Sequence, residues 1–571
     1  MSLRCALLDG TASQRVLPRG VAHLATIGAA SLVGDAVTPI GVTGSVALVG
    51  WAFRSAGFGA CEQFDAEEAE RILATGGRWA LENLWGNYIL VWADQTGRAH
   101  ILRSPVTGPA IYHCAAGETG RGPAFAFTDL ALARALGFTL DRPDPFAIDA
   151  EMRIPLLRGH ATGLRGVGEI LPGEIVRLGS AAPLPESWSP WNRMKAAPRR
   201  VEPDALRRKV MSVVSAWSMR FGRIQLELSG GLDSSIVAAC LAGRRDDWRA
   251  ITLATPDPDG DERVYARAAA ERAGAPLIEL LLSDDPVDPT APIARPRARP
   301  GGFGLLAPVD AHLGTAAADY GAEAIFTGAG GDNIFGYLTS AAPIVDAFRF
   351  AGPGAAWGAA GDLARVMNDN IWKALRLAAR KAVLPGRLWP SDDSLLSERF
   401  AGREPEHPWF DCAREAWPGQ RTYALKLLPI QPFLDGYDRA LTLPMIAPLL
   451  SQPLVEFGLG VPSWQWGEGG QDRALARSAF RNDVPAAVLA RRVKGRIESL
   501  FYPSFDRHRR RLRSFLLDGW LASEQLIDGD AVGALIDGRI RADGVAAIRL
   551  LHLADMERWV RSLVSPMRPA S

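Results

Sequence analysis

The chain has 571 residues, too many for one hydrophobic core, and this length favours roughly two to four domains. Its 48% hydrophobic and 22% charged residues are typical of a soluble globular protein. The formal net charge of +1 excludes a general attraction to nucleic acid or to an anionic membrane, and we expect neither as a partner.

The cysteines and the first residues indicate a reducing compartment. The five cysteines include no C-x-x-C pair and no His spacing of a zinc site, so we expect free thiols and no zinc. Residues 36–53 are uncharged and long enough to span a membrane, but their alternation around Pro39 predicts strands and a turn. MSLRCALLDG lacks the apolar core and cleavage site of a signal peptide, so we expect a cytoplasmic protein.

The first part of the chain, up to about residue 180, consists of short alternating runs broken by Gly, Pro and Asp. This pattern predicts mostly antiparallel sheet with a few helices. Near residues 187–203, proline, tryptophan and charge replace the alternation, which indicates a boundary. We therefore place one domain at residues 1–195 and a second at 196–571.

The second part alternates predicted strands with predicted helices. We expect strands up to Leu228, at 249–255, at 276–282 and up to Gly328, with helices between them and mainly helices beyond residue 409. Such alternation predicts an α/β fold with a doubly wound parallel sheet, whose ligand binds beyond the carboxyl ends of the strands. Two glycine-rich stretches, SGGLDSS at 229–235 and GAGGDN at 328–333, fall at those ends.

SGGLDSS has the features of an anion site. Gly230 and Gly231 allow the backbone to approach a ligand, and Ser234 and Ser235 begin a helix whose N–H groups and dipole suit pyrophosphate. A lone SGG is equally compatible with a tight turn and a serine cap, but the full string favours the phosphate site. The absence of a lysine after the glycines excludes a Walker loop.

A bound phosphate chain requires a cation, and each loop carries one acid. Asp233 and Asp332 are expected at neighbouring strand ends, and Mg²⁺ is usually held by a few carboxylates together with substrate phosphates. We therefore predict that Asp233 and Asp332 bind magnesium.

SGGLDSS resembles the pyrophosphate loop of the ATP pyrophosphatase superfamily. The other stretches that make the chain similar to asparagine-synthetase-like proteins are DERVYARAAAERAG at 261–274, GAGGDNIFGY at 328–337, QPFLDGYDRAL at 431–441 and GGQDRALARSAFRNDVPAAVLARRVKGR at 469–496. LWGNYILVWAD and GVGEILPGEIVRL resemble parts of their glutaminase-type domain. The resemblance implies a mostly β, Ntn-type glutamine-amidotransferase-like domain, followed by an ATP-pyrophosphatase-type adenylating domain with helical additions.

Such enzymes use ATP to adenylate a carboxylate, release pyrophosphate and let an amine attack the acyl-adenylate. The resemblance implies that Lys494 stabilises charge on the adenylate and the departing phosphates, a role that suits a compact ammonium, although alone it could be a surface lysine. Arg473 and Arg492 are further candidates for this cluster, whereas Tyr337 and His312 are expected to be structural. The residues implied to line the nucleotide and pyrophosphate site are Leu228, Ser229, Gly230, Gly231, Asp233, Ser234, Ser235, Leu253, Thr327 and Gly328.

The N-terminus lacks the nucleophile that glutamine hydrolysis requires. A glutaminase of this type uses an N-terminal Cys, whose own amine is the base, but here Met1 precedes Ser2 and Cys5 lies too far along. After loss of Met1, Ser2 would be a far weaker nucleophile than a thiol. We therefore expect a degenerate domain, with the amine supplied by the substrate.

The second loop separates the chain from two better-known branches. Asparagine synthetases have GEGxDE here, and β-lactam synthetases place a Tyr at the first acidic position, whereas this chain has Ala329 and Asn333. Neither side chain can act as a general base. With SGGLDSS, GAGGDN and no glutaminase nucleophile, the chain resembles a third branch, the lasso peptide cyclases. The resemblance implies an enzyme that joins an Asp or Glu side chain of a ribosomally made peptide to its N-terminal amine, forming a macrolactam. That amine, with a pKa of about 8, is partly neutral without help, and a prefolded peptide supplies proximity.

The resemblance implies ATP and Mg²⁺ as cofactors, a leader-free precursor peptide as substrate, a leader peptidase and a leader-binding protein as partners, and a role in antibiotic biosynthesis. Loops at 283–304 and 384–408 are candidates for holding the peptide. One alternative is an asparagine synthetase or β-lactam-synthetase-like enzyme acting on a small amino acid. Another is a catalytically idle scaffold of the same fold.

Overall fold

The structure is a computed structural model of the chain. It describes residues 3–10, 16–115, 123–180, 182–194, 197–243, 247–254, 261–282, 287–293, 295–301, 304–384, 386–491, 501–538 and 544–564.

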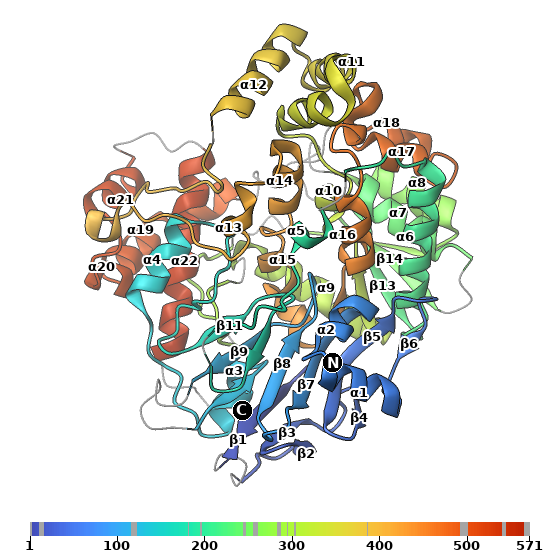
Figure 1. The fold of residues 1–571 in the computed structure, drawn as a ribbon. Helices are drawn as coiled ribbons and strands as arrows, with labels where there is room; N and C mark the ends of the chain where they lie inside the picture. The colour runs from blue at the N-terminus through green and yellow to red at the C-terminus, as the bar shows by residue number, and fades with distance from the viewer. Residues whose placement is uncertain are drawn as a thin grey trace.

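The N-terminal region contains two antiparallel sheets, as its alternating pattern predicts (Figure 1). One sheet has the order β11-β9-β10-β1-β3-β2 and the other β12-β8-β7-β5-β4, with β6 paired to β5. Their facing side chains form one apolar layer to which Leu7, Val49 and Ile101 belong. The strands are β1 Cys5–Asp9, β2 Val21–Ile27, β3 Ala30–Asp35, β4 Ile40–Thr43, β5 Val46–Arg54, β6 Ala60–Cys61, β7 Leu84–Ala93, β8 Ala99–Arg103, β9 Ile111–Cys114, β10 Phe125–Phe127, β11 Gly168–Ile170 and β12 Ile175–Arg177.

Four helices accompany these sheets, and a fifth follows them. They are α1 Ala66–Ala74, α2 Arg78–Asn83, α3 Leu130–Ala135, α4 Pro145–Arg153 and α5 Pro190–Arg193. The uncharged run at 36–53 forms β4 and most of β5, as expected. In the described part of the chain, no helix has the length and hydropathy needed to cross a membrane. All five cysteines are free thiols, as predicted.

A five-stranded sheet lies in the second region, in the order β15-β14-β13-β16-β17, and all its neighbouring strands are parallel. The predicted strands are confirmed, except that the two-residue β17 was not expected. Because β13 and β16 are neighbours, the loops that follow them lie side by side, where the strand order reverses. The elements are α6 Pro203–Ser218, β13 Ile224–Glu227, α7 Leu232–Leu241, β14 Trp248–Ala254, α8 Arg263–Ala273, β15 Leu277–Leu281, α9 Ala307–Tyr320, β16 Ala324–Thr327 and β17 Met445–Ile446.

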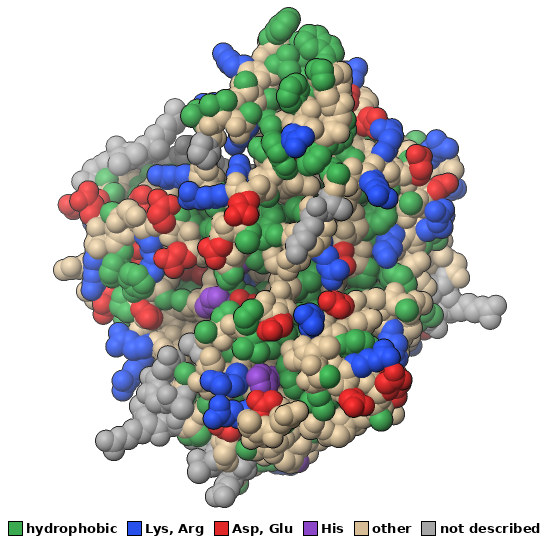
Figure 2. Space-filling model, viewed as in Figure 1, with side chains coloured by type: hydrophobic (Ala, Val, Ile, Leu, Met, Phe, Trp, Pro, Cys, Tyr) green, Lys and Arg blue, Asp and Glu red, His purple; other side chains and the backbone are tan. Residues whose placement is uncertain are grey.

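Helices make up most of the rest of the chain. Helices α11 and α12 project at one end of the molecule (Figure 1), and hydrophobic side chains cover much of this tip (Figure 2). The helices are α10 Gly331–Ile334, α11 Ala342–Met367, α12 Ile371–Val383, α13 Phe410–Ala413, α14 Pro418–Leu425, α15 Gln431–Asp435, α16 Gln452–Leu459, α17 Ala474–Ala479, α18 Ala486–Ala490, α19 Phe501–Leu517, α20 Trp520–Ser523, α21 Gly529–Ile536 and α22 Gly544–Val564.

The two regions share their hydrophobic cores. One buried cluster includes both Trp85 of β7 and Leu226 of β13, and the Phe53 and Trp217 rings meet edge to face across the predicted boundary, with centroids 4.8 Å apart. A second cluster joins α3 and α4 to the C-terminal helices α19 to α22. The last helices therefore pack against the N-terminal region (Figure 1).

Both loops proposed to hold a peptide are attached to the N-terminal region where they are described. Arg299, in the proline-rich segment, ion-pairs with Glu169 of β11, which also receives a hydrogen bond from Arg103. All three side chains are at most 2% exposed. In the 384–408 segment, Asp393 accepts a 2.7 Å hydrogen bond from Arg153 of α4. Arg299 and Asp393 thus link the two loops to the N-terminal region.

Candidate functional site

The loop after β13 is shaped by glycine. Gly230 has a φ of 69°, and a Cβ on it would lie 2.6 Å from the backbone nitrogen of Ala266, so a larger residue would be strained and would clash with α8. Gly231 precedes α7, and no side chain in the described part of the chain caps the helix. The N–H groups of the first turn are therefore available to an anion.

The hydroxyls of this loop line the start of α7. Ser229 Oγ accepts a 3.3 Å hydrogen bond from the backbone N–H of Gly231, and Ser234 Oγ donates to the Gly231 carbonyl at 3.3 Å. Ser235 Oγ is buried and has no hydrogen-bond partner among the described residues. The loop combines backbone donors and hydroxyls as the sequence predicts, which suits a phosphate chain.

The loop after β16 touches the first loop, and glycine makes this contact possible. A Cβ on Gly328 would lie 2.5 Å from the backbone nitrogen of Ser234, and one on Gly331 would lie 2.2 Å from Cγ of Asp233. Real Cβ atoms essentially never make contacts this short, so any side chain at either position would push the loops apart. The predicted meeting of the two glycine-rich stretches is confirmed.

Asp233 and Asp332 share one cationic group. Arg473 Nη1 lies 2.6 Å from Oδ1 of Asp332 and 3.2 Å from Oδ1 of Asp233, while its Nε lies 3.0 Å from Oδ2 of Asp472. Although burial alone would lower it, the pKa of Arg473 is raised by these three carboxylates. The backbone of Arg473 is left-handed, with a φ of 55°, directly before α17.

This arrangement fits a magnesium ion that is also bound by substrate. The two carboxylates lie close enough to hold one cation between them, since one guanidinium nitrogen reaches both. Within the described residues there is no group of three or more His, Cys, Asp or Glu side chains that could hold a metal alone. Phosphate oxygens of a substrate commonly supply further ligands to a Mg²⁺ held by a few carboxylates.

Of the other predicted site residues, some lie on the strands of the parallel sheet and two lie outside the described part of the chain. Leu228 is buried, Leu253 lies in the neighbouring β14, and Thr327 ends β16, where its Oγ1 accepts a hydrogen bond from the N–H of Ala329. Lys494 and Arg492 lie outside the described residues, so their roles stay predictions.

The chain that leads towards Lys494 approaches the glycine loop. Arg491 ion-pairs with Glu262, and its guanidinium stacks 4.3 Å from the ring centre of Tyr265. A Cβ added to Gly230 would lie 2.6 Å from the Cβ of Tyr265, so Tyr265 packs against the glycine loop. The described end of this segment is thus beside the predicted phosphate loop.

Lys426, which lies outside the sequence motifs described above, also reaches this site. Its Nζ donates a hydrogen bond to the Tyr337 carbonyl, and its own carbonyl accepts one from Nδ2 of Asn333. Burial lowers the pKa of Lys426 to about 8, against the opposing influence of Asp472 and Asp332. The rarity of lysine in this arginine-rich chain is the signal that could have identified it.

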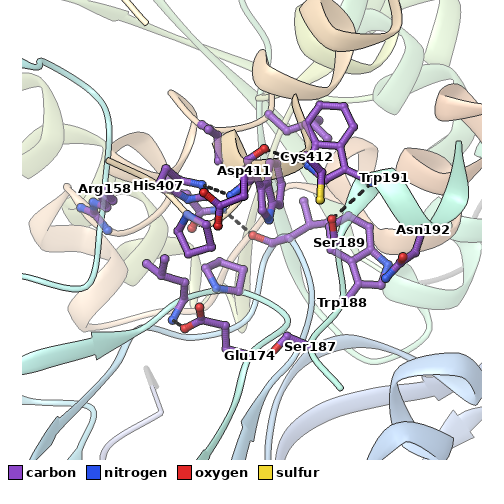
Figure 3. A pocket seen from close by; sticks show the side chains of 18 of the residues that line it. Arg158, Glu174, Ser187, Trp188, Ser189, Trp191, Asn192, His407, Asp411 and Cys412 are labelled. Carbon is purple, nitrogen blue, oxygen red and sulfur yellow. Dashed lines mark hydrogen bonds between the residues drawn. The ribbon is translucent and has the colours of Figure 1, made fainter. Parts of the chain in front are cut away.

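A cavity of about 280 Å³ is lined by none of the predicted site residues that the structure describes (Figure 3). Trp188, Trp191 and Trp409 supply aromatic walls, and His407 and Glu174 are among its polar residues. Leu427, which follows Lys426 in the chain, also lines it. The cavity therefore lies against the same segment that contacts the loop after β16.

Comparison with known proteins identifies the second region. No curated protein matches the chain. Residues 205–561 match the family model described as asparagine synthase, and this match contains both glycine-rich loops, Lys426 and Arg473. Because the match covers more than half of the 571 residues, the chain belongs to the asparagine synthase family, whose members are ATP-dependent ligases that form carbon–nitrogen bonds.

Proposed function

We propose that this chain is a lasso peptide cyclase. It adenylates an Asp or Glu side chain of a leader-free precursor peptide and joins that carboxyl to the N-terminal amine of the same peptide. The products are a macrolactam, AMP and pyrophosphate. The observation that carries this proposal is the loop after β16, where an acid for magnesium is present and both positions that supply a base or acid in related enzymes hold Ala329 and Asn333.

The surroundings of these two residues support their assignment. Asn333 is engaged structurally, because its amide nitrogen binds the carbonyl of Lys426. Ala329 is partly buried against the central hydrophobic cluster and offers only a methyl group. A small side chain here leaves room for a folded peptide, whose amine and activated carboxyl are already close together.

The state of Cys5 supports an N-terminal domain without glutaminase chemistry. Cys5 lies within β1 and is 3% exposed, and burial raises the pKa of its thiol to about 12. A buried neutral thiol is a poor nucleophile. We propose that residues 1–195 form a degenerate amidotransferase-like domain, that residues 196–571 form the adenylating domain, and that the amine comes from the peptide.

The chemistry assigns a task to each part of the site. A carboxylate oxygen of the peptide attacks the α-phosphorus of ATP, and the bond to pyrophosphate breaks. The first turn of α7, with Ser229 and Ser234, binds the departing phosphates, while Asp233 and Asp332 hold the metal. Magnesium, when bound, neutralises charge on the phosphates. Lys494 and Arg473 stabilise the charge that develops as the adenylate forms.

The proposal includes a cytoplasmic location and two partners, a peptidase that removes the leader and a protein that binds it. An asparagine synthetase using ammonia, or a cyclase of a small amino acid, remains the main alternative within the family. A gene for a short precursor peptide next to the gene for this chain would favour the peptide substrate.

The deciding experiment is mass spectrometry of a synthetic leader-free peptide, encoded by such a neighbouring gene, after incubation with the full chain, ATP and Mg²⁺. We expect loss of one water from the peptide, with equal amounts of AMP and pyrophosphate. Asp233→Ala should abolish both. AMP formation with free aspartate and ammonia, but not with the peptide, would contradict the proposal.

A further inference from the structure

Formation of the amide bond requires a group that accepts a proton from the attacking amine. When an amine attacks an acyl-adenylate, it must lose a proton, and the usual positions for a base hold Ala329 and Asn333. Another group in this part of the site would have to accept the proton if the step is assisted by the protein.

Lys426 occupies a suitable position. It directly follows α14, and its side chain extends to the turn after α10, where Nζ donates to the Tyr337 carbonyl. The Asn333 amide fixes its backbone from the other side. One contact of the amine and one of the backbone carbonyl therefore hold Lys426 against the loop that carries Asp332.

The charges around Lys426 come from α10 and from the residues just before α17. Asp332 lies in α10, while Asp472 and Arg473 precede α17. Arg473 bonds to both of these acids, so much of their negative charge is already compensated. No carboxylate in the described part of the chain forms an ion pair with Lys426 itself. A lysine in such surroundings gives up its proton more readily than an exposed one.

We propose that Lys426 is a further catalytic residue, whose neutral amine accepts the proton that the peptide's N-terminal amine loses during macrolactam formation. This inference rests on the proposed function. The amine nitrogen forms a bond to the acyl carbon, the bond from that carbon to the AMP oxygen breaks, and AMP leaves with the electron pair. The proton passes to Lys426 Nζ, which returns it to water before the next turnover.

The inference predicts a difference between two reactions of the same acyl-adenylate. Hydroxylamine is largely neutral near pH 8 and needs little help from a base, so it can capture the acyl group as a hydroxamate. Lys426→Met should lower macrolactam formation about 100-fold or more, the typical contribution of general base catalysis. Its ATP–pyrophosphate exchange and its hydroxamate formation, measured with the same synthetic leader-free peptide, should stay within about twofold of the unchanged chain.

Lys426→Arg distinguishes proton transfer from positioning. Arginine keeps the positive charge and can still donate to the Tyr337 carbonyl, but it does not release a proton near neutral pH. We expect this variant to lose macrolactam formation as Lys426→Met does.

The outcomes are separable. Recovery of macrolactam formation in Lys426→Arg would overturn the inference and assign a positioning role, and an equal fall in hydroxamate would assign Lys426 to adenylation. Lys373→Met, at an exposed lysine of α12 paired with Asp369, is the matched control and should behave like the unchanged chain. If the unchanged chain shows no pyrophosphate exchange with the peptide, the proposed function fails instead.

Discussion

One guanidinium nitrogen of Arg473 lies 2.6 Å from a carboxylate oxygen of Asp332, and the same nitrogen contacts the buried Asp233. The side chain thus supplies, between the two loops, the positive charge that we assign to magnesium when substrate is bound. The Arg473 guanidinium and the magnesium ion would then interact with the same two carboxylates, Asp233 and Asp332.

Replacing Arg473 should make the fold depend on the metal. Arg473→Met leaves Asp233 buried without this cation, and breaking a buried pair costs about 3 kcal/mol of unfolding free energy. Thermal denaturation should show a lower midpoint, and millimolar MgCl₂ should raise it more in the variant than in the unchanged chain. Arg365→Met, which removes an exposed arginine from its pair with Asp362, is the control. A magnesium effect of equal size in all three proteins would refute the shared site.

The contact between the loops predicts a severe effect from one methyl group. In Gly331→Ala the added Cβ would collide with Asp233, so the loops must separate. We expect ATP–pyrophosphate exchange to fall at least tenfold, since a displacement of about 1 Å can cost 100-fold in rate. Gly354→Ala is the matched control, because nothing lies within 4 Å of its added Cβ. Unchanged exchange in Gly331→Ala would show that the close approach is unnecessary.

The space beside Ala329 can be tested by filling it. Ala329→Tyr and Ala329→Glu add bulk beside the central hydrophobic cluster, on the loop that faces the proposed peptide. Both should reduce macrolactam formation at least tenfold, while calorimetry should give ATP affinity within about threefold of the unchanged chain. Normal cyclisation by either variant would show that a small residue is not required.

His407 predicts how stability changes with pH. Its Nδ1 accepts a 3.1 Å hydrogen bond from the Trp409 N–H, which requires a neutral ring, and burial lowers the pKa of His407 to about 3. The unfolded chain takes up this proton at its ordinary pKa of about 6.5, whereas the folded chain does not. The unfolding free energy should therefore fall as pH decreases from about 6.5 towards 3.

His407→Gln should reduce that slope, as measured by urea unfolding between pH 7 and pH 5. His312→Gln, at an exposed histidine on α9, should keep the slope of the unchanged chain. An identical slope in His407→Gln would mean that His407 does not stay neutral in the folded protein.

Local patterns were sufficient to predict the sheet edge but not the contacts across it. The alternation before Leu228 and the glycines after it are features of neighbouring residues, so the strand and the phosphate loop could be predicted. The bridge from Arg473 to Asp332 joins positions 141 residues apart. Arg473 could be suggested only by resemblance, and Lys426 was not identified, because burial and distant partners set the properties of both.

The same limit explains the loop at 283–304. The sequence makes this loop a candidate for holding the peptide, and the structure buries its Arg299 side chain against Glu169 of β11, a partner 130 residues earlier in the chain. Arg299 also pairs with Glu151, and both carboxylate partners lie far from it in the sequence. Nothing near Arg299 in the sequence indicates that it is buried.

The cores shared by the two regions have a consequence for how the chain could have evolved. If the N-terminal region performs no chemistry, it is still the surface on which Trp217 and the last four helices are packed. Deleting residues 1–195 would expose these apolar faces to water, so each part of the chain would need the other in order to fold. An N-terminal region without chemistry of its own would then be retained because the second region packs on it.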